Sequence, residues 1–144
     1  MADIKGVSPE EAVKLMEDGW QYVDVRSVPE FEAGHVPGSL NVPLLNMGPG
    51  GMQPNPDFMA VMQASFDTGA KLLLGCRSGG RSRRAAEMLV GVGFTELADL
   101  LPGWEGSKDA FGRSVPGWSK KDLPVETGNP PGLCYDDVKN RALG

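Results

Sequence analysis

Three observations predict that this chain forms one α/β domain with a mainly parallel sheet. Short apolar runs alternate with helical segments along the chain, which is the order of a sheet whose strands are joined by helices. The length of 144 residues suits a single domain. The most hydrophobic run, Lys71-Leu72-Leu73-Leu74-Gly75, has the uninterrupted apolar character of a central strand buried on both faces.

The N-terminal part carries two helix-start signatures. The sequence Ser8-Pro9-Glu10-Glu11 predicts a helix, because it combines a capping serine, a proline for the first turn and a glutamate that completes a capping box. Gly19 is a natural stop for this helix. A second capping signature at Ser27 predicts a short helix over about 28–33. Strands are expected over 21–25 and 39–42.

The remaining elements follow from glycine and proline punctuation. Residues 46–56 are rich in both and are expected to form a loop, after which Asn55-Pro56 opens another helix. The strand 71–75 leads into a tight loop over Cys76–Arg81. A helix is expected from about Arg81 to Val92, with Gly93 as its C-cap. The last strand is expected over 95–100.

Charge and cysteine content exclude several function classes. A net charge of −5 and a pI of about 4.8 oppose nonspecific nucleic-acid binding. The chain has no apolar run of about 18 residues and its first residues lack the order of a signal peptide. We therefore expect no membrane partner and a cytoplasmic location, or an organelle stroma or matrix if a transit peptide was removed. Two distant cysteines and one histidine match no zinc-ligand spacing, so neither a metal nor a cofactor is predicted.

Basic residues gather directly after one cysteine. Arg77, Arg81, Arg83 and Arg84 fall within eight positions of an otherwise acidic protein, immediately after Cys76. A solvated helix face would be the ordinary interpretation of such a run. We interpret this one as functional, because it coincides with a glycine-rich loop, and such loops bind anions.

The position of this loop predicts a reactive cysteine. Cys76 follows a buried strand, so it should lie at the carboxyl edge of the sheet, where open α/β sheets bind ligands. Gly79 and Gly80 allow the backbone to curl with its N–H groups pointing inward, and the next helix directs its N-terminal dipole to the same place. Together with two loop arginines, these features favour a thiolate over a thiol. We therefore predict a nucleophile or an anion cradle at Cys76 rather than an inert buried cysteine.

Three segments, in order, resemble the rhodanese domain. Tyr22-Val23-Asp24-Val25-Arg26 and the run from Glu30 to Pro43 look like its N-terminal signature. Cys76-Arg77-Ser78-Gly79-Gly80-Arg81-Ser82 resembles its active-site loop. The run from Gly93 to Trp104 is similar to its closing strand and turn, although that turn usually reads Gly-Gly and here reads Pro102-Gly103.

The resemblance implies a fold and an activity. It covers about residues 3–126 and implies a central, mainly parallel five-stranded sheet flanked by helices on both faces. We therefore expect a rhodanese-like domain over 1–126 and a loosely ordered tail over 127–144. A stretch longer than usual for the family, Glu105 to Trp118, lies before the end of this domain. Nothing in the sequence indicates an oligomeric state.

The implied activity is that of a thiosulfate sulfurtransferase. Cys76 would take the sulfane sulfur of thiosulfate, or of a similar small anionic donor, and form a persulfide. A thiol acceptor, or cyanide, would then remove the sulfur, with no histidine acting as base. The resemblance assigns donor binding and stabilisation of the terminal sulfur to the rest of the loop: Arg77, Ser78, Gly79, Gly80, Arg81 and Ser82.

Other candidate residues are interpreted as structural. His35 is expected to hold a turn rather than act as a general base. Asp24 and Arg26 are expected to pair and order the neighbouring turn. Trp104 and Trp118 are expected to pack, with lining of a pocket mouth as the alternative, and Cys134 is expected to be a bystander thiol in an acidic tail.

Two other functions stay open. The first is a phosphatase or arsenate reductase of the related fold found in activators of cyclin-dependent kinases, which also cradles a cysteine thiolate with loop amides and an arginine. That family uses Cys-x5-Arg, whereas this chain has Cys76-x4-Arg81, a smaller ring that suits one sulfur atom. The second is a non-catalytic rhodanese-like module that binds a partner, although such modules often lack the cysteine.

Overall fold

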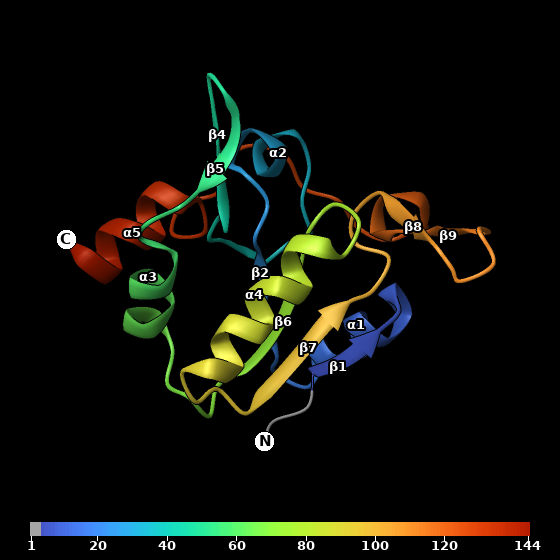
Figure 1. Ribbon diagram of the computed structural model, residues 1–144, viewed down its shortest axis with the longest axis horizontal. Coiled ribbons are helices and arrows are strands. Elements are labelled where there is room, and N and C mark those ends of the chain that lie inside the picture. The colour runs from blue at the N-terminus through green and yellow to red at the C-terminus, as the bar shows by residue number, and fades with distance from the viewer. Residues whose placement is uncertain (1–3) are drawn as a thin grey trace.

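A parallel sheet forms the centre of the molecule. A computed structural model describes residues 4–144. The five strands of the sheet are Ile4–Val7 (β1), Gln21–Asp24 (β2), Leu40–Asn41 (β3), Lys71–Gly75 (β6) and Glu96–Leu100 (β7). They are parallel throughout, in the order β1-β7-β6-β2-β3 (Figure 1). The apolar strand β6 is central, as its sequence predicts.

Helices cover both faces of this sheet (Figure 1). The helices are Pro9–Glu17 (α1), Val28–Ala33 (α2), Phe58–Ser65 (α3), Gly80–Gly91 (α4), Tyr135–Leu143 (α5) and the 3-10 helix Trp118–Lys120 (η1). Leu73 of β6 packs in a cluster with residues of α1 and η1, whereas Leu72 and Leu74 pack in a second cluster with residues of α3, α4 and α5. Both capping boxes form as predicted, at Ser8 and Ser27. None of the helices described is long and apolar enough to cross a bilayer.

The edge strand β1 has no counterpart among the strands located from the sequence. Its four residues, Ile4 to Val7, include an exposed lysine and an exposed glycine, and only Val7 is buried. They pair in parallel register with residues 97–100 of β7. Because this strand depends on a partner about 90 positions away, local sequence patterns do not reveal it.

Two short hairpins form where the sequence predicted no strands. Residues 46–56, expected as a loop, contain an antiparallel hairpin of Leu45–Gly48 (β4) and Gly51–Pro54 (β5), with Gly51 at a φ of +103°. Gly106–Lys108 (β8) and Ser114–Pro116 (β9) form a second hairpin after β7, which is therefore not the last strand. In both hairpins the two strands are joined by antiparallel backbone pairing across a tight connection.

The segment expected to be a loosely ordered tail is instead packed against the domain. Its helix α5 buries Tyr135 and Val138 in the same cluster as α3. The Asn41 backbone N–H donates to the Leu133 carbonyl at 2.9 Å, and the Asn55 side-chain amide donates to the Tyr135 hydroxyl at 3.0 Å. Few apolar residues are needed here, because those present share one helix face.

Candidate active site

The loop that carries Cys76 connects the central strand to α4. Gly75 ends β6, and a Cβ atom there would overlap the Tyr22 hydroxyl. Gly79 has a φ of +102°, and a Cβ atom there would lie 2.5 Å from the Leu101 carbonyl oxygen. Glycine is therefore required on both sides of the cysteine, once for space and once for backbone conformation as well.

The sulfur of Cys76 has two polar neighbours. The Gly79 N–H donates to Sγ at 3.1 Å, and the Ser82 hydroxyl oxygen lies 3.5 Å from Sγ. Helix α4 begins at Gly80, so its positive end is also adjacent. Several N–H groups of this loop were expected to point toward the sulfur. Among these loop residues, all of which the structure describes, Gly79 provides the N–H that donates to Sγ. Cys76 is 2% exposed.

Residues 103–105, which follow β7, bond to the backbone of the Cys76 loop. The Trp104 N–H donates to the Cys76 carbonyl at 2.7 Å, and the Glu105 N–H donates to the Arg77 carbonyl at 2.9 Å. A Cβ atom on Gly103 would lie 2.6 Å from the Arg77 carbonyl oxygen, and Gly103 has a φ of +69°. Gly103, the second residue of the Pro102-Gly103 turn, must therefore be glycine, because its backbone packs directly against the Arg77 carbonyl.

A cavity of about 410 Å³ lies over the loop arginines. Its size falls within the range of small-molecule sites. Cys76 itself does not line this cavity. The residues that do are Arg26, Glu30, Ala33, Gly34, Met52, Arg77, Arg81, Trp104 and Glu105.

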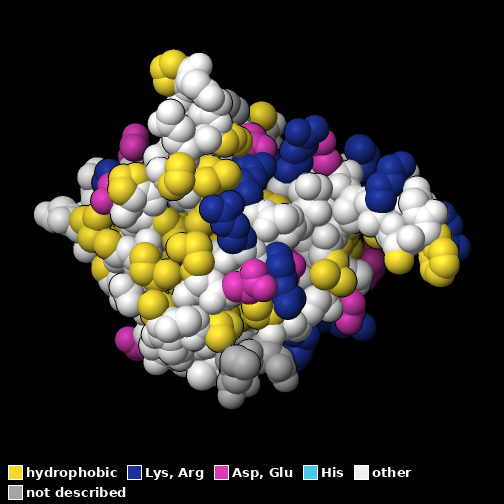
Figure 2. Space-filling view, in the orientation of Figure 1, with side chains coloured by type: hydrophobic (Ala, Val, Ile, Leu, Met, Phe, Trp, Pro, Cys, Tyr) yellow, Lys and Arg dark blue, Asp and Glu magenta, His cyan; other side chains and the backbone are white. Residues whose placement is uncertain are grey.

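Each arginine of the cavity is paired with a carboxylate. Arg77 pairs with Glu105 at 2.8 Å, and both side chains are at least half exposed. Arg26 pairs with Asp24 at 2.7 Å, and both are buried. Basic and acidic side chains also lie next to one another on the face that carries α4 (Figure 2). The cavity is therefore close to charge-balanced, which the arginine cluster in the sequence does not suggest.

Arg81, the predicted anion-binding residue, forms a two-pronged pair with Glu30. Its two terminal nitrogens donate to the two carboxylate oxygens of Glu30, at 2.7 and 3.0 Å. Burial raises the pKa of Glu30, but hydrogen bonds from Arg81 and Ser27 outweigh it and hold that pKa at about 2. The carboxylate is thus ionised near neutral pH and compensates the arginine.

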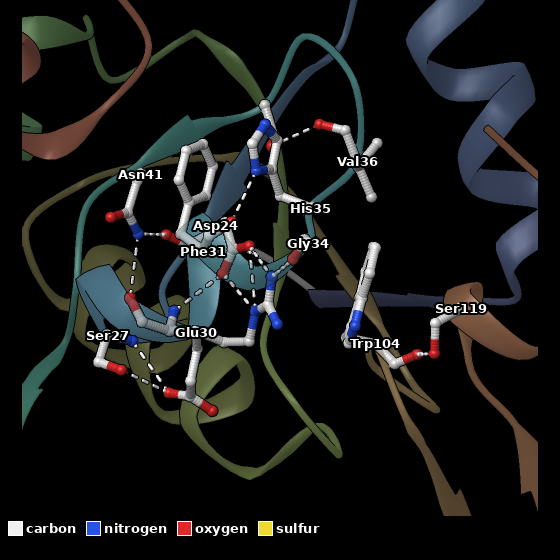
Figure 3. Close-up of polar contacts among 12 residues, drawn as sticks. Asp24, Ser27, Glu30, Phe31, Gly34, His35, Val36, Asn41, Trp104 and Ser119 are labelled. Carbon is white, nitrogen blue, oxygen red and sulfur yellow. Dashed lines mark hydrogen bonds and ion pairs between the residues drawn. The ribbon is translucent and has the colours of Figure 1, made fainter. Parts of the chain in front are cut away.

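Asp24, Arg26 and His35 are all buried, and Figure 3 shows Asp24 and His35 with their polar contacts. The Arg26 guanidinium donates to both Asp24 oxygens and, at 2.6 Å, to the Gly34 carbonyl. It also lies 4.9 Å from the centre of the Trp104 ring. His35 donates from Nδ1 to the Phe31 carbonyl at 2.7 Å, and its Nε2 lies 3.2 Å from a Glu126 carboxylate oxygen, so both ring nitrogens have partners in the surrounding turn.

The two tryptophans differ in their surroundings. Trp118 is 2% exposed and packs in the core, as expected. Trp104 is half-buried and lines the cavity, which was the alternative interpretation. Cys134, at the start of α5, is half-buried and is not in a disulfide.

Sequence reasoning missed one group close to the sulfur. Asp99 of β7 is 2% exposed and accepts a hydrogen bond from the Ser82 hydroxyl, the same hydroxyl that neighbours Sγ. The available signal was a lone carboxylate inside the apolar run Leu97 to Leu100. Glu30 and Glu105 were missed as arginine partners because they are distant in sequence.

Comparisons with known proteins agree with this fold and loop. A family model described as a rhodanese-like domain matches residues 8–110. This chain belongs to the rhodanese-like domain family. Thiosulfate sulfurtransferase 16, chloroplastic, of Arabidopsis thaliana is 37% identical to it over 120 residues, covering 83% of this chain and 91% of that protein. The family therefore includes proteins named as sulfurtransferases.

Two further similarities concern length and fold. Rhodanese-like domain-containing protein 15, chloroplastic, of Arabidopsis thaliana is 32% identical over 115 residues, which are 80% of this chain and 57% of that protein. The crystal structure of Rv0390 from M. tuberculosis superposes with a TM-score of 0.71 at 28% identity, covering 88% of this chain and 100% of that one. The predicted rhodanese-like fold, with a five-stranded parallel sheet and flanking helices, is confirmed.

Proposed function

We propose that this rhodanese-like domain is a thiosulfate sulfurtransferase that works through a Cys76 persulfide. The observation that carries the proposal is the hydrogen bond of 3.1 Å from the Gly79 N–H to Sγ, at the N-terminal end of α4. A donor in this place stabilises negative charge on sulfur, either on the attacking thiolate or on the persulfide.

The proposed reaction has two half-reactions. In the first, the Cys76 thiolate attacks the sulfane sulfur of thiosulfate, a new S–S bond forms, and the old S–S bond breaks so that sulfite leaves with the electron pair. In the second, a thiolate or cyanide attacks the outer sulfur of the persulfide and takes it, which returns the Cys76 thiolate. No net oxidation of the enzyme occurs, because the sulfur enters and leaves at the same oxidation level.

Arg77 and Arg81 are the proposed contacts for the anionic donor. Arg77 is the more available, since its side chain is 61% exposed and its ion pair with Glu105 lies at the surface. Arg81 is 16% exposed and stays bound to Glu30. We propose that Arg77 turns toward the donor while Arg81 supplies fixed charge at the cavity wall.

The length of the loop favours sulfur over phosphate chemistry. From Cys76 to Arg81 the ring has one position fewer than the Cys-x5-Arg loop of the related phosphatases. A donor must sit about 3 Å from the charge that it stabilises, so a smaller ring suits one sulfur atom better than a tetrahedral oxyanion. Both cysteines are free, which fits the reducing cytoplasm or an organelle stroma or matrix.

Intact-mass measurement after treatment with thiosulfate tests the proposal. The wild type is expected to gain one sulfur atom and to lose it on addition of cyanide. Cys76→Ser should gain none, and the matched control Cys134→Ser should behave as the wild type does. An aryl phosphate is offered in parallel and should not be hydrolysed.

Two results would contradict the proposal. Hydrolysis of the aryl phosphate with no sulfur on Cys76 would support the phosphatase alternative. Absence of both activities from a folded wild type, with Cys76 reduced, would support a binding module.

A further inference from the structure

A series of buried polar groups leads from the Cys76 sulfur through Ser82 of α4 to Asp99 of β7. Cys76 Sγ lies 3.5 Å from Ser82 Oγ, and Ser82 in turn donates to Asp99. Ser82 is 0% exposed and Asp99 is 2% exposed. The thiol and the carboxyl group are therefore linked through one hydroxyl.

The positions of the donors determine which group donates and which accepts in the series Cys76, Ser82 and Asp99. A serine hydroxyl has one proton and two lone pairs. Its oxygen lies nearer to Asp99 than to the Gly79 carbonyl, which is 3.2 Å away, so the proton is best placed toward the carboxylate. A lone pair of Ser82 is then free to accept the thiol proton of Cys76, as the geometry of that contact indicates.

We propose that Ser82 and Asp99 form a proton relay for Cys76, in which Asp99 holds the proton that leaves the thiol. When the thiol ionises, its proton passes to Ser82 Oγ and the Ser82 proton passes to Asp99. The products are a thiolate, an unchanged hydroxyl and a neutral carboxylic acid. The site keeps one negative charge throughout, so the buried region does not have to hold two.

The surroundings of Asp99 suit a proton acceptor. Burial raises the pKa of Asp99, and the hydrogen bond from Ser82 and the charge of Arg83 offset only part of that effect. Burial also raises the pKa of Tyr22 well above 10, so this neighbouring phenol stays neutral and does not compete for the proton. The other charged groups near the relay are Asp24, Arg26 and Arg81 on the sulfur side, and Lys108 and Asp109 beside Asp99.

During sulfur transfer the relay would conserve protons. The thiolate attacks while Asp99 is protonated, and sulfite leaves without needing a proton from the relay. After the acceptor removes the sulfur, the thiolate recovers its proton from Asp99 through Ser82. This role in turnover rests on the proposed function, but the ionisation step precedes any sulfur chemistry and is tested separately from it.

Alkylation of Cys76 by iodoacetamide, measured by mass in a Cys134→Ser background, gives the test. When a proton moves from Cys76 to Asp99, none is taken up from or released to solution. The fraction of Cys76 present as thiolate is therefore independent of pH while the two groups together hold one proton. The wild-type rate should therefore be flat between about pH 5 and 7, below the usual thiol pKa of about 8.5. In Asp99→Asn the rate should rise about tenfold per pH unit over that range, as for an isolated thiol.

Two further variants separate the relay from a structural role. Ser82→Ala keeps the Asp99 charge but removes the hydroxyl, and should also lose the flat region, whereas Ser82→Thr keeps the hydroxyl and should restore it. A wild-type rate that rises tenfold per pH unit would overturn the proposal. A flat region that survives in Asp99→Asn or in Ser82→Ala would do so as well. If Asp99→Asn fails to fold, the serine pair decides the matter, and no outcome depends on persulfide formation.

Discussion

The two cysteines of this protein both lie at the N-terminal end of a helix, yet their surroundings are opposite. Three residues separate Cys76 from the start of α4 at Gly80, and the Gly79 N–H donates to its sulfur. Cys134 is the N-cap of α5, where Asp137 accepts the Gly132 N–H at 2.8 Å. The hydrogen bond from Gly132 lowers the pKa of Asp137, and a weaker contribution comes from the Cys134 side chain.

The first turns of the two helices explain this difference. The first turn of α4 has no acidic residue and carries Arg81, whereas that of α5 carries Asp136 and Asp137. At α5 the carboxylates already occupy the positive end of the helix. The positive end of α4 thus has no carboxylate of its own first turn to compensate it, whereas that of α5 has two.

The largest expected effect separates the two cysteines by activity. Cys76→Ser should lower kcat/KM for thiocyanate formation from thiosulfate and cyanide by more than about a thousandfold, because the covalent intermediate cannot form. Cys134→Ser should stay within about twofold of the wild type. A large loss in both variants would show that the comparison is wrong and that Cys134 takes part in turnover.

The next effect concerns the loop backbone. Gly79→Ala should destabilise the fold by at least about 2 kcal/mol and remove most activity, because alanine at this positive φ is strained and its Cβ would meet the Leu101 carbonyl. Gly80→Ala is the matched control, since a Cβ there meets nothing within 4 Å. Its stability in urea should change by less than about 1 kcal/mol. Equal losses in the two variants would mean that the loop conformation differs from the one described.

Arg81→Ala should have a smaller effect, on both function and stability. We expect kcat/KM for thiosulfate to fall about tenfold, and stability to fall by about 1 kcal/mol because Glu30 loses its partner. The folded-state pKa of Glu30 is about 2, below its ordinary value of 4.5. Its contribution is therefore present above about pH 4.5 and is lost as the pH falls toward 2.

Thermal unfolding as a function of pH tests whether the stability contributed by the Arg81–Glu30 pair is lost at low pH. The difference in Tm between wild type and Arg81→Ala should be largest above about pH 4.5 and should narrow below it, and Glu30→Gln serves as the control that removes the titrating group. A difference that grows on acidification would contradict the assignment of the pair.

The smallest expected effect is a gain of reactivity at α5. In the Asp136→Asn/Asp137→Asn variant, Cys134 should be alkylated about two- to fivefold faster at pH 7, because carboxylates no longer compensate the helix dipole. The rate at Cys76 in the same molecule is the internal control. An unchanged Cys134 rate would mean that exposure, and not charge, limits this thiol.

The features predicted from sequence are those encoded locally. Capping boxes at Ser8 and Ser27, the central strand β6 and the Cys76 loop all depend on residues within a few positions of one another. Strand β1, the two hairpins and the packing of α5 depend on distant partners or on turn geometry, and the sequence did not locate them.

The same distinction applies within the site. The cysteine, the glycines and the arginines are contiguous in the loop and were found. Glu30 lies 51 positions from Arg81 and Asp99 lies 17 positions from Ser82, so their roles appear only when the strands and helices are assembled. In sequence, Asp99 is merely a polar interruption of a strand.

The packing of α5 has a consequence for how the protein is made. Leu133 and Tyr135 bond to Asn41 and Asn55, and Val138 fills the cluster shared with α3. During synthesis the strands and α4 leave the ribosome before α5 does, so the nascent chain exposes part of an unfinished apolar surface. Pauses in translation between about residues 110 and 143 should therefore be the interval in which this protein most needs a chaperone.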